Sequence, residues 1–158
     1  MRTVRLTLHV PQKAAVEVYQ TLSDFGRYPE LSDAVRSVSV SHLSDDVTVS
    51  SWEVTFRSGI LRWTEEDRFD PDALTIAFNQ IAGDIAVFEG SWTVEPVQDG
   101  ADIVFRADLD MGIPSLADAL EPIAVRALVD NTVSIVTGLV GGVEVLGTEV
   151  SVPAGSRR

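Results

Sequence analysis

The order of sequence patterns along this chain constrains its fold more than any single motif does. Residues 35–110 read as one short strand after another, with turn residues between them and no helical stretch. From 114 to 145 the pattern changes to one long helix, with apolar residues that include Leu128, Ile135 and Leu139. A curved antiparallel sheet closed by a single helix encloses a space. Because enclosed, mostly apolar spaces are where proteins bind small molecules, this order predicts a ligand-binding fold.

The N-terminal residues add one strand and two short helices to this pattern. Residues 2–10 alternate between apolar and polar side chains, which is typical of a strand with one buried face. Pro11 ends this strand, residues 12–25 have the apolar spacing of a helix that stops at Gly26, and a second helical turn starts at Tyr28. The sequence therefore predicts an α+β fold in which a seven-stranded antiparallel sheet wraps around a long C-terminal helix, with two short helices after the first strand.

Length and charge narrow the classes of partner. A chain of 158 residues suits one domain, which we expect over residues 1–147 with a flexible tail at 148–158. The absence of cysteine excludes disulfides and thiolate chemistry.

A net charge of −12 disfavours nucleic acid and anionic membranes as partners. The N-terminus does not resemble a signal peptide, and no window approaches the ~20 apolar residues of a membrane span. We therefore expect a cytoplasmic protein.

Several short motifs occur in the order found in one superfamily. They are Val10-Pro11, the stretch from Asp24 to Leu31, Trp63-Thr64 followed by Asp70-Pro71, Gly90-Ser91-Trp92, and Gly112-Ile113-Pro114 followed by Asn131. Together they resemble the START-like, helix-grip (SRPBCC) superfamily, which includes polyketide cyclases/aromatases and coenzyme Q-binding proteins. The resemblance covers residues 3–145 and implies a helix-grip fold of the START/Bet v 1-like type. This fold hosts cyclases, lipid carriers and steroid binders, so the resemblance alone does not decide the function.

The strand at residues 60–69 carries the clearest chemical signal. Alternation places Glu65 and Asp67 on the same face as Trp63 and Phe69, so both acids should point inward unless a bulge shifts the register. If both carboxylates are desolvated, the pKa of one of them should be raised. A carboxyl group with a raised pKa can act as a general acid or base. In the alternative interpretation this end of the strand is wet and both acids are solvated.

The remaining candidates for the site have apolar or neutral side chains. The expected ligand-binding residues on the strands are Trp52, Phe56, Trp63, Phe78, Phe88, Trp92 and Phe105, each of which can equally be ordinary core. Tyr28 offers a phenol near the expected mouth, and its alternative role is to pack the short helix. Asn131 lies among apolar helix residues, so it should either bond a carbonyl of the sheet or meet the ligand.

This sequence lacks the acid and base groups that some polyketide cyclases of the resembled superfamily use. Some aromatic polyketide cyclases have an arginine near the position of Asp67, and some use a histidine in the sheet with an aspartate on the last helix. Here the helix position for that aspartate reads Ile135, His9 faces outward and His42 lies near a turn. The sequence also contains no phosphate-binding glycine loop and no metal-ligand spacing, so we expect neither a cofactor nor a metal.

Three functions therefore remain open. The first is a cofactor-independent polyketide cyclase, aromatase or dehydratase that folds an apolar polycarbonyl intermediate in the cavity. Glu65 and Asp67 would move protons, Tyr28 would polarise a carbonyl, and an acyl carrier protein is one route of delivery. The second is a non-catalytic carrier of a quinone, lipid or other apolar metabolite, and the third is a ring-forming isomerase. Paired inward acids are costly in a purely apolar carrier, which favours the first function. Either a monomer or a homodimer is compatible with the sequence.

Overall fold

One antiparallel sheet and one long helix organise the protein, as the computed structural model shows for residues 1–56, 59–112 and 117–152. The fold is of the predicted α+β class. In chain order the elements are β1 (Arg2–Pro11), α1 (Ala15–Leu22), the 3-10 helix η1 (Phe25–Arg27), α2 (Tyr28–Leu31), β2 (Val35–His42), β3 (Val47–Phe56), β4 (Gly59–Asp70), β5 (Thr75–Gly83), β6 (Val87–Val97), β7 (Gly100–Asp110), α3 (Ala117–Val140) and β8 (Glu144–Ser151).

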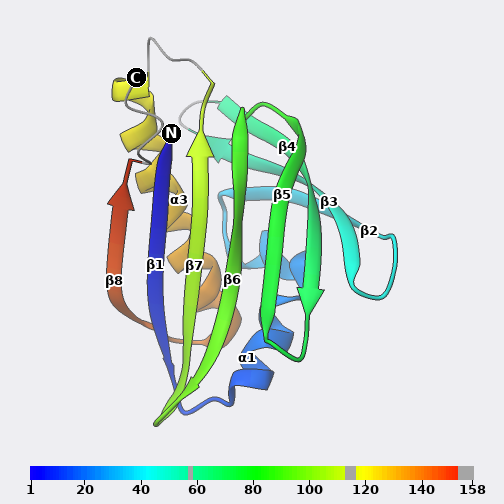
Figure 1. The fold of residues 1–158 in the computed structure, drawn as a ribbon, viewed down its shortest axis with the longest axis vertical. Helices are drawn as coiled ribbons and strands as arrows, with labels where there is room; N and C mark the ends of the chain where they lie inside the picture. The colour runs from blue at the N-terminus through cyan, green and yellow to red at the C-terminus, as the bar shows by residue number, and fades with distance from the viewer. Residues whose placement is uncertain (57–58, 113–116, 153–158) are drawn as a thin grey trace.

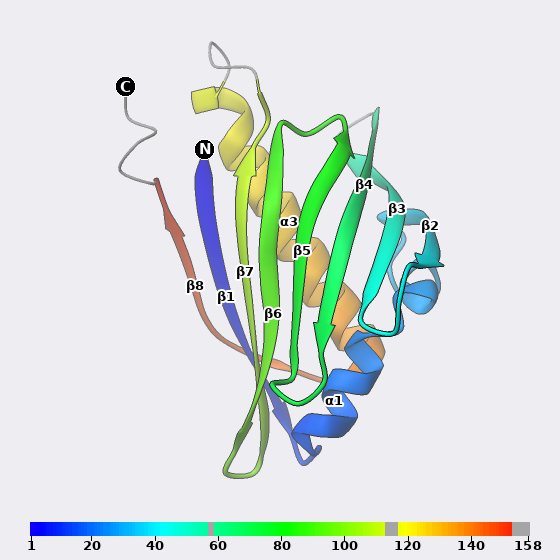
Figure 2. The same ribbon diagram turned by 45° about the vertical axis from the view of Figure 1, so that its right-hand side comes forward.

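The strand order of the sheet is β2-β3-β4-β5-β6-β7-β1-β8 (Figure 1). Strands β2 to β7 follow each other as neighbours, and every pair is antiparallel. The first strand pairs with β7, so the segment with α1, η1 and α2 carries the chain from β1 to the opposite edge at β2. Figure 2 shows the sheet curving around α3, which runs across its concave side.

The core lies between this concave side and the helices, because one face of each strand is apolar. In β1, Val4, Leu6 and Leu8 are completely buried, whereas the intervening residues face outward. Helix α3 contacts β1, β7, α1 and α2, and it buries Val136 and Val140 in the same core. The space that forms the site is therefore enclosed by the sheet on one side and by the helices on the other.

The C-terminal part of the chain differs from the sequence prediction. Helix α3 ends at Val140, not at 145, because Gly141 adopts a φ of 93° and its N–H bonds the Thr137 carbonyl at 2.9 Å. This left-handed conformation favours glycine and is common directly after a helix. The expected start of the helix at 114, and with it part of the motif at 112–114, lies outside the described residues.

The described residues form an eight-stranded sheet, so the expected count of seven strands was one too low. The additional strand, β8, pairs with the free edge of β1 and includes residues 148–151, which we expected in a flexible tail. Every residue of β8 is exposed. No buried face shaped its sequence, so the alternation that revealed the other strands is absent here.

Helix α3 also corrects the expectation about apolar segments. By length and composition, residues 119–140 are apolar enough to cross a membrane, with a mean hydropathy of 1.5. We expected no such window from the sequence. In this fold the same helix packs against β1 and β7, and a core helix passes the same test of length and composition.

Candidate functional site

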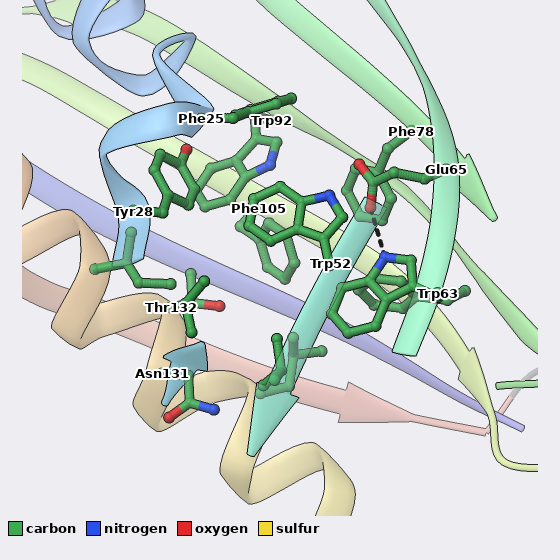
Figure 3. Close-up of a pocket in the computed structure, with 15 residues that line it drawn as sticks. Phe25, Tyr28, Trp52, Trp63, Glu65, Phe78, Trp92, Phe105, Asn131 and Thr132 are labelled. Carbon is green, nitrogen blue, oxygen red and sulfur yellow. Dashed lines mark hydrogen bonds between the residues drawn. The ribbon is translucent and has the colours of Figure 1, made fainter. Parts of the chain in front are cut away.

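An apolar cavity of about 100 Å³ lies between the concave face of the sheet and α3 (Figure 3). The predicted residues that line it are Tyr28, Trp52, Trp63, Glu65, Phe78, Phe88, Trp92, Phe105 and Asn131. A smaller space of about 60 Å³ adjoins it and shares Trp63, Phe88 and Asn131 as walls. Of the other predicted residues, Phe56 lines only the smaller space, and Asp67 lines neither.

Sequence reasoning missed six residues of the cavity wall as ligand contacts. They are Phe25, Val35, Val54, Leu128, Thr132 and Ile135. The three on α3 follow each other at helical spacing on the side that faces the sheet, so the helical period contained this signal. Phe25 belongs to the short 3-10 helix η1, where neither the helical nor the strand period indicates which side chains are buried.

Aromatic rings make most of the cavity wall and pack directly on one another. Trp52 and Trp63 are cross-strand partners whose ring planes are nearly parallel, 6° apart, with centroids separated by 6.0 Å. Phe78 and Phe105 stack in a similar way at 5.9 Å. Such contacts hold large side chains in fixed orientations and add to the energy of burial. The wall is therefore shaped before any ligand arrives.

A glycine within β6 allows this wall to form. Gly90 lies between Phe88 and Trp92, and a Cβ atom at this position would be 1.9 Å from the backbone oxygen of Arg106 on β7. A side chain here would force the two strands apart. The motif Gly90-Ser91-Trp92 therefore has a physical reason that does not depend on resemblance.

The register of β3 and β4 places both predicted acids inside. Asp67 pairs with Thr48 and Glu65 pairs with Ser50, on the same face as the Trp52–Trp63 pair. Glu65 is 5% exposed and Asp67 is fully buried. The sheet does have an irregularity beside Glu65, but the extra residue is on β5, so the alternation of β4 is unchanged. The interpretation that both acids are solvated is therefore wrong.

Each acid accepts hydrogen bonds from the neighbouring side chains. The indole N–H of Trp63 donates to Oε1 of Glu65 at 2.8 Å (Figure 3). The hydroxyls of Ser50 and Thr48 donate to Oδ2 of Asp67 at 2.6 and 3.0 Å. Ser50 in turn accepts from the indole N–H of Trp52 at 2.8 Å. The other oxygen of Asp67, Oδ1, is buried and has no donor among the described residues.

This environment favours the neutral form of Glu65. Burial raises the pKa of its carboxyl well above the usual 4.5, and hydrogen bonding with Asp67 and the charge of Asp67 raise it further. The N–H of Trp63 acts in the opposite direction but is the smallest of these effects. A proton on Glu65 also provides a donor for Asp67, whose Oδ1 otherwise has none. The two buried acids therefore interact, and the result is a raised pKa of Glu65.

Tyr28 and Asn131 differ in how free their polar groups are. The ring of Tyr28 lines the cavity, but its hydroxyl donates to the carbonyl of Leu22 at 2.7 Å, and burial raises its pKa. The phenolic proton is thus already engaged within the protein. The side chain of Asn131 is half-buried, lines both spaces and has no hydrogen bond to the described residues. Of its two expected roles, the bond to a sheet carbonyl is not seen among the described residues, and contact with a ligand stays a prediction.

The two histidines lie outside the cavity, as the strand pattern predicted for His9. Nδ1 of His9 lies 2.8 Å from Oδ1 of Asp102 on the outer side of the sheet, and His42 is exposed. Ile135, which occupies the helix position discussed above, lines the cavity. In the part of the chain that the structure describes, no three His, Asp or Glu side chains are grouped so that they could hold a metal ion.

Together the fold and the cavity define a helix-grip protein with an internal apolar cavity, and comparison with known sequences identifies the family. The family model described as polyketide cyclase / dehydrase and lipid transport matches residues 10–133, and the chain belongs to this family. No curated protein matches the chain.

Solved structures show the same fold at low sequence identity. TTHA0849 from Thermus thermophilus has a TM-score of 0.80 and 24% identity, with 88% of this chain and 94% of that chain covered. The Zhui aromatase/cyclase from a Streptomyces species has a TM-score of 0.76 and 17% identity, with 89% of this chain and 93% of that chain covered. A START superfamily protein from Mycobacterium smegmatis has a TM-score of 0.75 and 15% identity, with 89% of this chain and 98% of that chain covered. These similarities confirm the predicted helix-grip, START-like fold.

Proposed function

We propose that the protein binds a small apolar carbonyl compound in the aromatic cavity and catalyses its cyclisation or dehydration without a cofactor. The observation that carries this proposal is a buried Glu65, whose pKa is raised by burial, in a cavity wall that is otherwise almost entirely apolar. Among the described residues, no other carboxyl group lines this cavity. A neutral carboxylic acid in such a site can donate its proton to an oxygen of a bound molecule.

Dehydration of a β-hydroxy ketone illustrates the chemistry. Glu65 gives its proton to the β-hydroxyl group, which leaves as water when the carbon–oxygen bond breaks. The resulting carboxylate takes the proton from the carbon next to the ketone, and the electron pair of that C–H bond forms the new double bond. Glu65 ends protonated again, so the reaction needs no external acid or base. The indole N–H of Trp63 stabilises the carboxylate between the two proton transfers.

The other predicted residues support this step without moving protons to the substrate. Asp67 keeps Glu65 protonated, and the aromatic wall holds the substrate in one orientation, which itself lowers the barrier. We assign Tyr28 to the wall, because its hydroxyl is engaged with Leu22. Asn131 is placed to accept or donate a second hydrogen bond to the ligand.

The size of the cavity indicates a compact ligand. An apolar cavity of roughly 150 Å³ is known to accommodate benzene. The main space and its neighbour, about 100 and 60 Å³, together match one aromatic ring with a short substituent. We therefore favour a one-ring carbonyl compound over a long polycarbonyl chain. Arrival on an acyl carrier protein would change how the substrate enters but not the chemistry at Glu65.

A non-catalytic carrier is the second candidate, and the apolar wall favours it. A quinone carbonyl would accept a hydrogen bond from neutral Glu65 without any reaction. The family description itself includes both polyketide cyclase / dehydrase and lipid transport. The two candidates differ in one measurable respect, because only the first predicts turnover that depends on the proton of Glu65.

The test uses the aldol addition product of acetophenone and acetaldehyde, an aryl β-hydroxy ketone whose dehydration gives a conjugated, ultraviolet-absorbing enone. We expect Glu65→Gln to lose turnover while it still binds the ketone, and Asp67→Asn to lower it. Glu66→Gln, on the outward face of the same strand, should keep full activity. If the native protein binds the ketone but does not accelerate its dehydration, the catalytic proposal is wrong and the carrier function is favoured.

A further inference from the structure

A second, outer groove lies behind the acid pair, on the surface of the molecule. Its volume is about 400 Å³, and its wall includes Phe25, Thr48 and the ionisable side chains Asp24, His42 and Asp45. Phe25 lines both this outer groove and the inner cavity. Its ring packs against the rings of three other aromatic residues, so it separates the two spaces. Glu65 lines the inner cavity, whereas neither acid lines the outer groove.

Thr48 links the outer groove to the buried acids. Its hydroxyl donates to Oδ2 of Asp67 at 3.0 Å, and the same residue forms part of the groove wall. Asp67 has no exposed surface of its own, and hydrogen bonding with it contributes to the raised pKa of Glu65. Ser50 bonds the same oxygen of Asp67, but it is fully buried and its other contact is the indole of Trp52. Of these two residues, only Thr48 lines the surface groove.

We propose that Thr48 and Asp67 form a proton path from the outer groove to Glu65, separate from the cavity that holds the ligand. The inference rests on the proposed function, in which Glu65 gains and loses a proton. Substrate in the cavity would cut Glu65 off from water on that side. A path from behind lets the group exchange its proton while the cavity is occupied. Thr48 acts through Asp67 and does not touch the ligand.

The transfer is balanced in protons and breaks only O–H bonds. A hydronium ion in the outer groove gives a proton to the hydroxyl oxygen of Thr48. Thr48 releases its own proton to Oδ2 of Asp67 across the existing hydrogen bond. The carboxyl group of Asp67 then turns about its Cβ–Cγ bond and passes the proton to an ionised Glu65. The ionisable groups that line the groove are His42 and the acids Asp24 and Asp45, and carboxylates attract hydronium ions.

Infrared spectroscopy tests this path without a substrate. A protonated Glu65 gives a carbonyl stretching band, identified by its loss in Glu65→Gln, and the band shifts when the proton is replaced by deuterium. The rate of this shift after transfer into deuterium oxide measures access of solvent protons to Glu65. We expect Thr48→Val to slow the exchange by at least about tenfold, a change of one order of magnitude in rate. Thr48→Ser keeps the hydroxyl and should exchange at the native rate.

Two further variants separate the path from a structural effect. Ser50→Ala removes the other hydrogen bond to the same oxygen of Asp67 but should leave the exchange fast, because Ser50 does not face the outer groove. If Thr48→Val does not fold, Thr48→Cys has a similar size and only a weak donor and acceptor, and it should be slow as well.

The possible results distinguish this proposal from the proposed function. Native-like exchange in Thr48→Val, or equal slowing in Ser50→Ala, overturns the proton path and leaves the catalytic role of Glu65 standing. Absence of the carboxylic acid band at neutral pH overturns both, because Glu65 would then be ionised in the folded protein.

Discussion

Replacement of Glu65 by glutamine should change the stability of the protein in a way that depends on pH. The new amide side chain would have the shape of a protonated glutamic acid, with an oxygen that can accept from Trp63 and an N–H that can donate to Asp67. In the native protein the folded-state pKa of Glu65 is raised above its ordinary 4.5. Below the ordinary pKa the carboxyl is protonated in both the folded and the unfolded state, so the variant should lie within ~1 kcal/mol of the native protein.

The difference should then grow as the pH rises. Between pH 4.5 and the raised folded-state pKa, the folded state binds a proton that the unfolded state has released, so the native protein loses stability with increasing pH. The loss is ~1.4 kcal/mol per pH unit for a full proton. Glu65→Gln should therefore become steadily more stable than the native protein as the pH rises from 4.5, until the pH reaches the folded-state pKa of Glu65.

Urea unfolding of both proteins between pH 4.5 and 8 measures this difference, because the effects of acids that do not interact with Glu65 cancel in the comparison. The pH at which the difference stops growing gives the folded-state pKa of Glu65. Glu66→Gln is the matched control, since Glu66 forms a surface ion pair with Arg68 at 2.7 Å and should show no such rise. A difference for Glu65→Gln that does not change with pH would refute the neutral-acid reasoning.

Two further predictions concern the cavity wall. Gly90→Ala should lower the free energy of unfolding by about 1–3 kcal/mol, because its Cβ would collide with the backbone of β7. Gly147→Ala in β8, where nothing lies within 4 Å, should be near neutral, and equal losses in urea unfolding would contradict this account. Ile135→Phe should fill the cavity and weaken acetophenone binding at least about tenfold, measured by quenching of tryptophan fluorescence. Ile123→Phe, on an exposed part of the same helix, should bind normally, and unchanged binding in Ile135→Phe would place the probe elsewhere.

The fold was predictable wherever one face of an element is buried. The alternation in β1 and β4 revealed both strands and placed Glu65 and Asp67 inside, since the bulge beside them falls on β5. β8 was missed because burial did not select its residues and its backbone alone attaches it to β1. The end of α3 was overestimated because the apolar pattern continues past Gly141, where the backbone turns.

Most residues of the cavity wall were predictable from the sequence, but the hydrogen bonds of the acids and of Tyr28 were not. Alternation identified most of the aromatic side chains, and it also places Thr48 and Ser50 on the inward face with Trp52. What it could not show is that these hydroxyls lie opposite the acids, because this depends on the register between β3 and β4. The engagement of the Tyr28 hydroxyl with Leu22 arises from the local path of η1 and α2, which has no sequence period.

The most direct test of the catalytic site is a crystal structure of the protein with acetophenone bound. We predict that the ring occupies the aromatic cavity and that the ketone oxygen lies ~2.5–3.0 Å from the carboxyl oxygen of Glu65 that does not bond Trp63, as expected for an O–H···O hydrogen bond. Acetophenone bound in the cavity with its carbonyl turned toward Asn131, out of reach of Glu65, would contradict the proposed role of this acid.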